Sequence, residues 1–278
     1  MRSSSVGVAV AFLLHASLAA AQPGTAGSAT SPPAPPAARS GEPSVEAGIR
    51  DDAASGRTWV SPTALTPPAG TFGAQSVQIL IAGASYSPTD RLAISANTFL
   101  PLPGAGWIVL GGIKLKVADL GRLKLAAHLA VTYVDGEVTV HDGGRELGER
   151  EHVRGGRAIL GGVGTLCLDA GCHSLLNGYL SSGIAMEAGE GVHGPNSVFG
   201  SVAWIQRLAG RFKLALELFS IIEQDADPGA FGWYGMRYTR RSFAFDAGMI
   251  RVFCDDCGEV HDLGGFGLPW LAFTFRAL

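Results

Sequence analysis

The sequence predicts an all-β protein: an antiparallel transmembrane β-barrel of about twelve strands, after a signal peptide and a disordered N-terminal tail. Two observations of composition and one of pattern support this prediction. Only 16% of the 278 residues are charged, and 39 are glycine, whereas a soluble protein has about 25% charged residues. Runs of about ten residues alternate apolar and polar side chains with a period of two, as strands between lipid and a lumen require.

The N-terminus has the features of a secretory signal peptide. Arg2 supplies the positive charge, residues 6–18 form a short apolar run, and residues 19–21 are small alanines that suit cleavage. The apolar run is too short for a membrane-spanning helix. We therefore expect residues 1–21 to be removed on export. Residues 22–56 are rich in Pro, Ala, Ser and Gly, which predicts a disordered periplasmic tail.

The barrel is expected to occupy residues 57–278. Phe212, Leu214, Leu216 and Leu218 share one face of a run whose other face carries Lys213, and the other runs alternate in the same way. We predict strands at residues 58–60, 76–85, 92–97, 107–117, 123–133, 158–168, 175–188, 197–208, 212–224, 230–238, 242–252 and 268–276.

The connections between these runs separate into two classes. The first class is short turns, and the second is longer polar loops, the longest of which is residues 136–156. An even number of strands puts both termini on the periplasmic side, as in bacterial single-chain barrels. We expect the short turns on that side, at residues 87–90, 118–122, 169–173, 208–211 and 239–242. We expect the long loops outside, at residues 136–156, 190–196, 225–230 and 255–266.

Residues 58–97 resemble the opening of uncharacterised bacterial outer-membrane β-barrel proteins. The resemblance rests on the Pro62-Thr63-Ala64 element, a glycine-rich approach to an aliphatic strand, and a Tyr-x-x-Thr-Asp turn from Tyr86 to Asp90. The ending, residues 265–270 followed by an alternating aromatic strand, fits the same pattern. The resemblance implies a porin-like barrel with no assigned activity.

An outer-membrane location carries expectations about partners. The barrel would contact outer-membrane lipid and lipopolysaccharide, and the barrel insertion machinery would assemble it. Small solutes would pass through the lumen if it is open. The net charge of −3 provides no electrostatic reason to expect nucleic acid. We expect eight aromatic residues to form girdles at the two membrane interfaces, namely Trp59, Trp107, Trp204, Trp233, Tyr234, Tyr238, Phe243 and Trp270.

Polar side chains on the lumen faces are the main candidates for function. Both signs of charge are present, so these side chains could fill a narrow interior as ion pairs and hydrogen bonds. Alternatively, the cationic members could line a pore that favours anions. A barrel of this size lies between filled small barrels and water-filled porins. The predicted lumen-lining residues are Arg91, Lys114, Lys116, Lys124, His128, Lys213, Glu217, Arg237 and Asp246.

The four cysteines form two local pairs, Cys167 with Cys172 and Cys254 with Cys257. Thiols this close in an exported protein oxidise, so we predict two disulfides. If the second pair is reduced, Cys254, Cys257 and His261 form a Cys-x2-Cys-x3-His pattern that could bind zinc or copper. The structural disulfide is the expected state, and we expect no cofactor.

Histidines and serines suggest two further chemistries. His141, His152, His193 and His261 are predicted in outer loops beside acidic residues and could hold a cation, although such side chains are ordinarily solvated. An outer-membrane lipid or peptide hydrolase would need a serine near a histidine. No G-x-S-x-G element is present, and Ser181 and Ser182 have no identifiable base, so we expect no enzyme.

The leading functional prediction is therefore a narrow pore or a structural surface protein of the outer membrane, with a mixed-charge lumen. The first alternative is the hydrolase. The second is a soluble periplasmic β-barrel that binds an apolar ligand, in which Leu214, Leu216, Phe243 and Phe245 would point inward.

Overall fold

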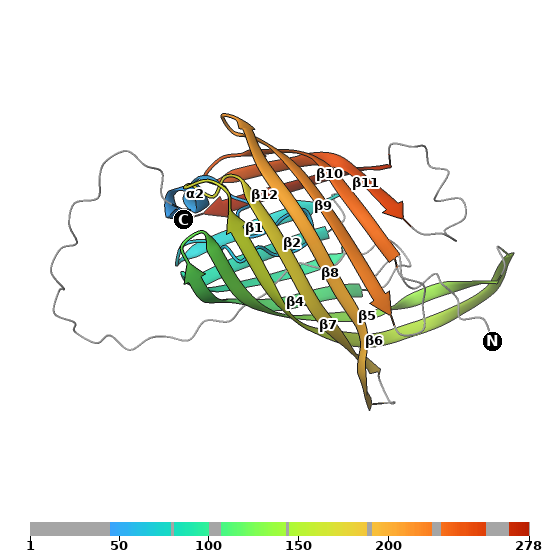
Figure 1. Cartoon of the computed structure of the whole chain (residues 1–278). Helices are drawn as coiled ribbons and strands as arrows, with labels where there is room; N and C mark the ends of the chain where they lie inside the picture. The colour runs from blue at the N-terminus through green and yellow to red at the C-terminus, as the bar shows by residue number, and fades with distance from the viewer. Residues whose placement is uncertain are drawn as a thin grey trace, which may run out of the picture.

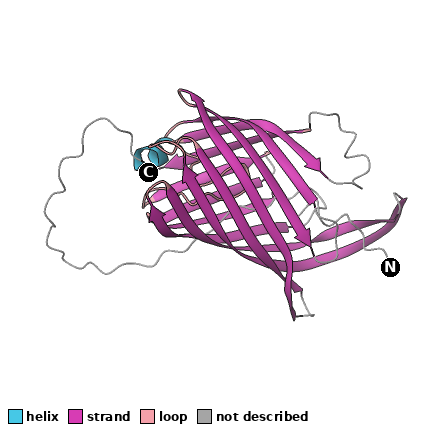
Figure 2. Cartoon of the chain, viewed as in Figure 1, coloured by secondary structure: helices cyan, strands magenta, loops and turns pink. Residues whose placement is uncertain are grey.

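Twelve antiparallel strands form one closed barrel, as the sequence predicts. Figures 1 and 2 show the computed structural model, which describes residues 45–78, 81–99, 107–142, 145–187, 191–223, 229–253 and 267–277. Each strand pairs with its neighbours in the chain, and β1 pairs with β12 to close the barrel. No helix within these ranges is long and apolar enough to cross a membrane. The strands are β1 (Thr71–Val77), β2 (Ile81–Thr89), β3 (Leu92–Phe99), β4 (Trp107–Leu120), β5 (Leu123–Asp142), β6 (Arg145–Cys167), β7 (Leu175–Glu187), β8 (Gly191–Ala209), β9 (Phe212–Glu223), β10 (Gly229–Thr239), β11 (Phe243–Phe253) and β12 (Leu268–Ala277).

Alternation along each strand separates a polar or small interior from an apolar exterior. In β9, Lys213 and Glu217 are buried inside, whereas Leu216 and Leu218 are 37% and 53% exposed on the outside. Leu214 lies on the same outer face as Leu216. In β11, Phe243 and Phe245 lie on the outer face, and the buried Ala244 and Asp246 lie on the inner face. The four apolar residues that an apolar-ligand barrel would point inward therefore face outward.

Short turns gather at one end of the barrel. Gly121 and Gly210 have φ of 72° and 55° in the turns between β4 and β5 and between β8 and β9. Glycine adopts this left-handed conformation without steric cost, which permits a very short connection between antiparallel strands. β12 ends at the same end, beside helix α2 (Val45–Asp51) (Figure 1). We call this end the turn end.

The predicted loop at residues 136–156 is instead a continuation of two strands, so this prediction is wrong. β5 runs to Asp142 and β6 begins at Arg145, and these two residues pair. The hairpin projects beyond the other strands at the end opposite α2 (Figure 1). Residues 191–196 of the predicted loop at 190–196 likewise lie in β8, which begins at Gly191. The sequence between residues 136 and 156 lacks a regular apolar alternation, but the backbone pairing of β5 with β6 continues through it.

The predicted first strand at residues 58–60 is also wrong, because those residues lie inside the barrel. A second wrong prediction restores the expected number of strands. The predicted strand at 76–85 is a hairpin in which β1 ends at Val77 and β2 begins at Ile81, and these two residues pair. Gln78 has a φ of 52° as the chain reverses. Aliphatic residues continue through the reversal, so the sequence reads as a single strand. The predicted count of twelve is therefore correct although two of its members differ.

Residues 45–51 form helix α2, and residues 52–56 continue from it into the barrel, which corrects the predicted disordered tail for residues 45–56. Residues 22–44 lie outside the described part of the chain. After α2, residues 52–69, which we call the lumen segment, enter the barrel from the turn end. Thr58, Thr63 and Ala64 are fully buried. The interior of the barrel is thus occupied by the chain's own N-terminal residues.

Helix α2 is seated on the wall at the turn end. A Cβ atom at Gly48 would come within 1.5 Å of the backbone oxygen of Gly171, so only glycine permits this approach. Val45 and Ile49 pack against the buried apolar cluster of the interior. This docking positions the lumen segment at the point where it enters the barrel.

Candidate functional site in the lumen

The lumen segment folds back on itself within the barrel. Arg57 forms a β-bridge with Pro62, the amide of Thr58 donates to the oxygen of Ser61 at 2.9 Å, and the amide of Thr63 donates to the oxygen of Gly56 at 3.0 Å. These bonds satisfy part of the backbone of a buried loop. The remaining polar groups of the loop need partners from the wall.

Glu217 of β9 provides most of the partners for the tip of this loop. Its carboxylate accepts hydrogen bonds from the amides of Trp59, Val60 and Ser61 at 2.8, 2.9 and 3.1 Å, and from the hydroxyl of Thr58 at 2.8 Å. The side chain of Glu217 is 3% exposed. Four donors converge on one buried carboxylate, which holds the loop tip against the wall and compensates the burial of the charge.

Asp246 of β11 joins two arginines, one from the wall and one from the lumen segment. Arg237 Nε lies 2.5 Å from Asp246 Oδ1, and Arg57 Nη2 lies 2.7 Å from Asp246 Oδ2. Arg237 also donates to the backbone oxygens of Arg57 and Thr58 at 3.1 and 2.5 Å. The wall therefore binds both the charge and the backbone of the lumen segment.

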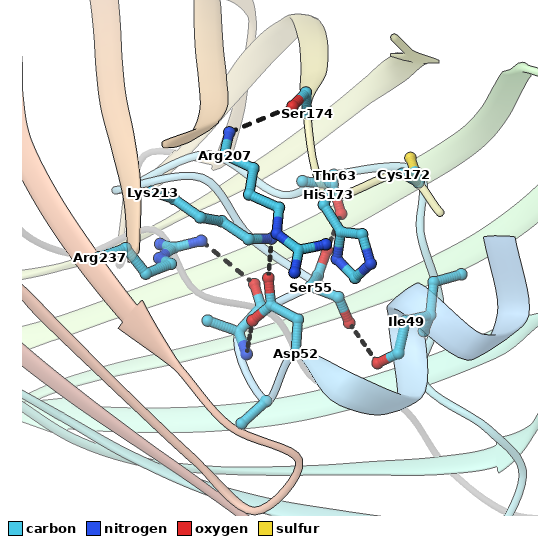
Figure 3. Close-up of polar contacts among 12 residues, drawn as sticks. Ile49, Asp52, Ser55, Thr63, Cys172, His173, Ser174, Arg207, Lys213 and Arg237 are labelled. Carbon is cyan, nitrogen blue, oxygen red and sulfur yellow. Dashed lines mark hydrogen bonds and ion pairs between the residues drawn. The ribbon is translucent and has the colours of Figure 1, made fainter. Parts of the chain in front are cut away.

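A second ion pair lies near α2, at the entrance of the lumen. Lys213 Nζ is 2.6 Å from Asp52 Oδ2, and Figure 3 shows Lys213 and Arg237 pointing toward Asp52. Burial alone would raise the pKa of Asp52, but the positive charges of Lys213 and Arg237 outweigh it and lower this pKa from 3.8 to about 2. Asp52 is therefore ionised over the physiological pH range.

Neutral and cationic side chains complete the seat of the segment. Lys114 donates to the oxygens of Gly56 and Leu65 at 3.0 and 2.7 Å. Arg276 donates to the oxygens of Ile49 and Ala53 at 2.7 and 3.0 Å. On the opposite wall, Asn177 donates to the oxygen of Pro62 at 3.0 Å, Thr165 accepts from the amide of Ala64 at 2.8 Å, and Ser201 donates to Ser61 at 2.7 Å.

Aromatic side chains pack at the tip of the loop. Trp59, Trp233 and Trp270 are 2%, 3% and 2% exposed and belong to the buried apolar cluster. The rings of Trp233 and Trp270 meet edge to face, with 6.3 Å between their centroids. The prediction that these three tryptophans form membrane-interface girdles is wrong, since they fill the lumen. Trp107, in contrast, is 58% exposed on the outer face.

The nine predicted lumen-lining residues divide into two groups. Lys114, Lys213, Glu217, Arg237 and Asp246 are all buried, and all five contact the lumen segment. The other four do not take part in this seat. Lys124 pairs with Asp119, His128 Nδ1 lies 3.2 Å from the hydroxyl of Tyr179, Lys116 lies 3.7 Å from Asp119, and Arg91 is exposed at a turn.

The cysteine prediction is confirmed for one pair. Cys167 and Cys172 form a disulfide with 4.6 Å between their Cα atoms, next to the docked helix α2. Cys254, Cys257 and His261 lie outside the described residues, as do the side chains of His141, His152 and His193.

Sequence reasoning missed half of this site. Asp52 and Arg57 lie in the stretch predicted to be a tail and a first strand, where no periodicity marks them. Arg276 could have been found, because it shares the inward face of β12 with Thr274 while Phe273 and Phe275 face outward. Thr165 and Asn177 are also at inward positions, but their short neutral side chains resemble ordinary lumen filling.

No protein-family model matches this chain, and no curated protein matches it either.

Proposed function

We propose that this protein is an outer-membrane β-barrel whose narrow pore is closed by its own N-terminal segment, residues 52–69. The observation that carries the proposal is the set of six inward charged wall residues, each bonded to that segment. A barrel that served only as a surface scaffold could fill its lumen with wall side chains alone. A separate segment that is covalently joined to the wall only through β1, and that is otherwise held mainly by polar groups and by the docked helix α2, is an arrangement that can be withdrawn.

Support for a membrane location comes from the outer surface of the barrel. Large apolar side chains are exposed on consecutive strands, and Leu160, Leu180 and Val202 are each 64% exposed. A continuous apolar exterior of this kind is unfavourable in water and is expected where the barrel meets lipid. An outer-membrane protein with its short turns on the periplasmic side would receive the lumen segment from the periplasm.

The polar character of the seat supports a closed pore over a permanently filled barrel. Buried ion pairs contribute little net stability compared with apolar packing of the same volume, because removing charges from water is costly. Their geometry instead specifies one docked position for the segment. The same charges would face water in a lumen from which the segment has been withdrawn.

The proposal is tested by expressing the full chain in a Gram-negative bacterium, isolating membranes, and checking heat-modifiable gel mobility. Conductance in planar bilayers is then compared for the wild type and for a variant that lacks residues 45–69. Deletion of residues 22–44, which leaves α2 and the lumen segment in place, is the matched control. We expect small or rare currents from the wild type and the control, and sustained currents from the variant that lacks residues 45–69.

Two outcomes would contradict the proposal in different ways. A folded variant without residues 45–69 that carries no current would remove the pore and leave a structural surface protein. Recovery of the wild type in the soluble periplasmic fraction would remove the membrane location itself.

A further inference from the structure

The lumen segment does not fill the whole barrel. A cavity of about 120 Å³ lies between this segment and the inner faces of β12, β1, β2, β3 and β4. Ser85 of β2 lines the cavity, and it is exposed even though it faces the lumen. Solvent therefore reaches this side of the interior. A water molecule occupies about 30 Å³ in the liquid, so the cavity has room for a small solute.

The charged groups that line this cavity are all positive. They are Arg57 of the lumen segment, Lys114 of β4 and Arg276 of β12, and none of the described lining residues is Asp or Glu. Arg57 is paired with Asp246, which it shares with Arg237. Lys114 and Arg276 donate only to backbone oxygens and to the hydroxyl of Ser55. Two buried basic side chains thus face the same space with no carboxylate at ion-pair distance among the described residues.

Several residues that line the same cavity carry a buried polar atom without a partner. Seven buried side-chain atoms in the described part of the chain have no hydrogen-bond partner, and four of them belong to residues that line it: Arg57 Nε, Trp59 Nε1, Trp270 Nε1 and Thr71 Oγ1. Trp59 and Trp270 are each only 2% exposed. Indole and guanidinium nitrogens can donate but cannot accept. An occupant that satisfies them must present acceptors.

From these observations we infer that the cavity is a binding site for a small oxyanion, a carboxylate or a phosphate. Such a solute provides several acceptor oxygens for the indole and guanidinium N–H groups, and its charge compensates Lys114 and Arg276. A neutral solute would supply acceptors but provide no counter-charge for the two buried basic side chains. Gln75 and Asn97, which bond to each other at 2.6 Å, add amide groups to the wall. Where the inference concerns passage of the anion, it rests on the proposed pore.

Binding is tested on the full chain in detergent micelles by isothermal titration with inorganic phosphate and, separately, with succinate. We expect saturable 1:1 binding of at least one of them. Which of the two binds distinguishes a phosphate site from a carboxylate site. Lys114→Met should weaken binding about tenfold or more, as expected for loss of one hydrogen bond to a charged group. Lys116→Met is the matched control on the same strand and should leave affinity unchanged, since Lys116 does not line the cavity.

Because Lys114 also holds the lumen segment, a second variant separates anion binding from folding. Trp270→Phe keeps an aromatic ring in the cluster but removes the indole N–H, and it should weaken anion binding several-fold without changing heat-modifiable mobility. The inference would be overturned if neither phosphate nor succinate binds to the folded wild type. So would equal losses from Lys114→Met and Lys116→Met. Anion binding by the wild type, with no current from the variant that lacks residues 45–69, would remove the pore and keep the site. Current from that variant, with no anion binding by the wild type, would do the reverse.

Discussion

Arg57 and Asp246 are 189 residues apart in the chain, yet their side chains form an ion pair of 2.7 Å inside the barrel. The pair links the lumen segment to β11. Arg237 binds the other oxygen of the same carboxylate. One buried carboxylate thus pairs with two guanidinium groups, and its loss would leave both without this ion pair.

Asp246→Asn should therefore be the most destabilising of the conservative changes at the site. Removing one partner of a buried ion pair costs about 3–5 kcal/mol, because the remaining charge stays buried. We expect the free energy of unfolding in urea, followed by tryptophan fluorescence, to fall by that amount. The double variant Arg57→Gln with Asp246→Asn should lose less than the sum of the single variants, since the two residues interact. Additive losses would show that the pair is not coupled.

Glu217→Gln should loosen the tip of the lumen segment while leaving the wall intact. The amide keeps the size of the carboxylate, but it replaces one acceptor oxygen by an NH₂ donor. Backbone N–H groups that donate to Glu217 in the wild type would then face this donor and lose their acceptor. A loss of about 2–3 kcal/mol in docking would raise the fraction of open pores at least tenfold. Bilayer conductance measures this fraction. Asp119→Asn, at a partly exposed carboxylate away from the segment, should leave the conductance at the wild-type level.

Acid should weaken the ion pair between Asp52 and Lys213 at the lumen entrance. The pKa of Asp52 in the folded protein is about 2, below its ordinary value of 3.8. The unfolded chain therefore binds a proton first as the pH falls. The stabilisation is complete above about pH 4 and is lost as the pH falls toward 2, and it amounts to about 2 kcal/mol. The difference in unfolding free energy between the wild type and Asp52→Asn should shrink over this interval. A difference that is constant from pH 6 to pH 2 would contradict the assignment.

Reduction of the disulfide between Cys167 and Cys172 should destabilise the turn end locally. The closed loop is short, so the loss of chain-entropy stabilisation is about 2 kcal/mol. Cys172 and the neighbouring Gly171 contact the region where α2 docks. We expect the double variant Cys167→Ser with Cys172→Ser to lower the temperature of heat modification. The matched control replaces Cys254 and Cys257. A larger effect from the control would indicate that the stabilising pair is the other one.

The wall of the barrel could be predicted because each of its residues responds to a local rule. Lys213, Glu217 and Asp246 were recognised as inward residues from the period-two alternation of β9 and β11, which needs no knowledge of any other strand. The short turns at Gly121 and Gly210 were recognised from local composition. Alternation failed in the hairpin beyond residue 136, where the sequence is polar at successive positions, and where aliphatic residues continue through the reversal after Val77.

By itself, the sequence determined the closed all-β wall and the inward position of five charged residues, because alternation along a strand records which face is buried. Only the tertiary structure decided what those charges bind. Residues 52–69 carry no periodicity, and their partners, such as Glu217 for Thr58 across 159 positions, come together only when the barrel closes. Closure creates an interior from which water is largely excluded. Within it, an otherwise unremarkable polar segment finds buried carboxylates, ammonium groups and guanidinium groups at hydrogen-bond distance.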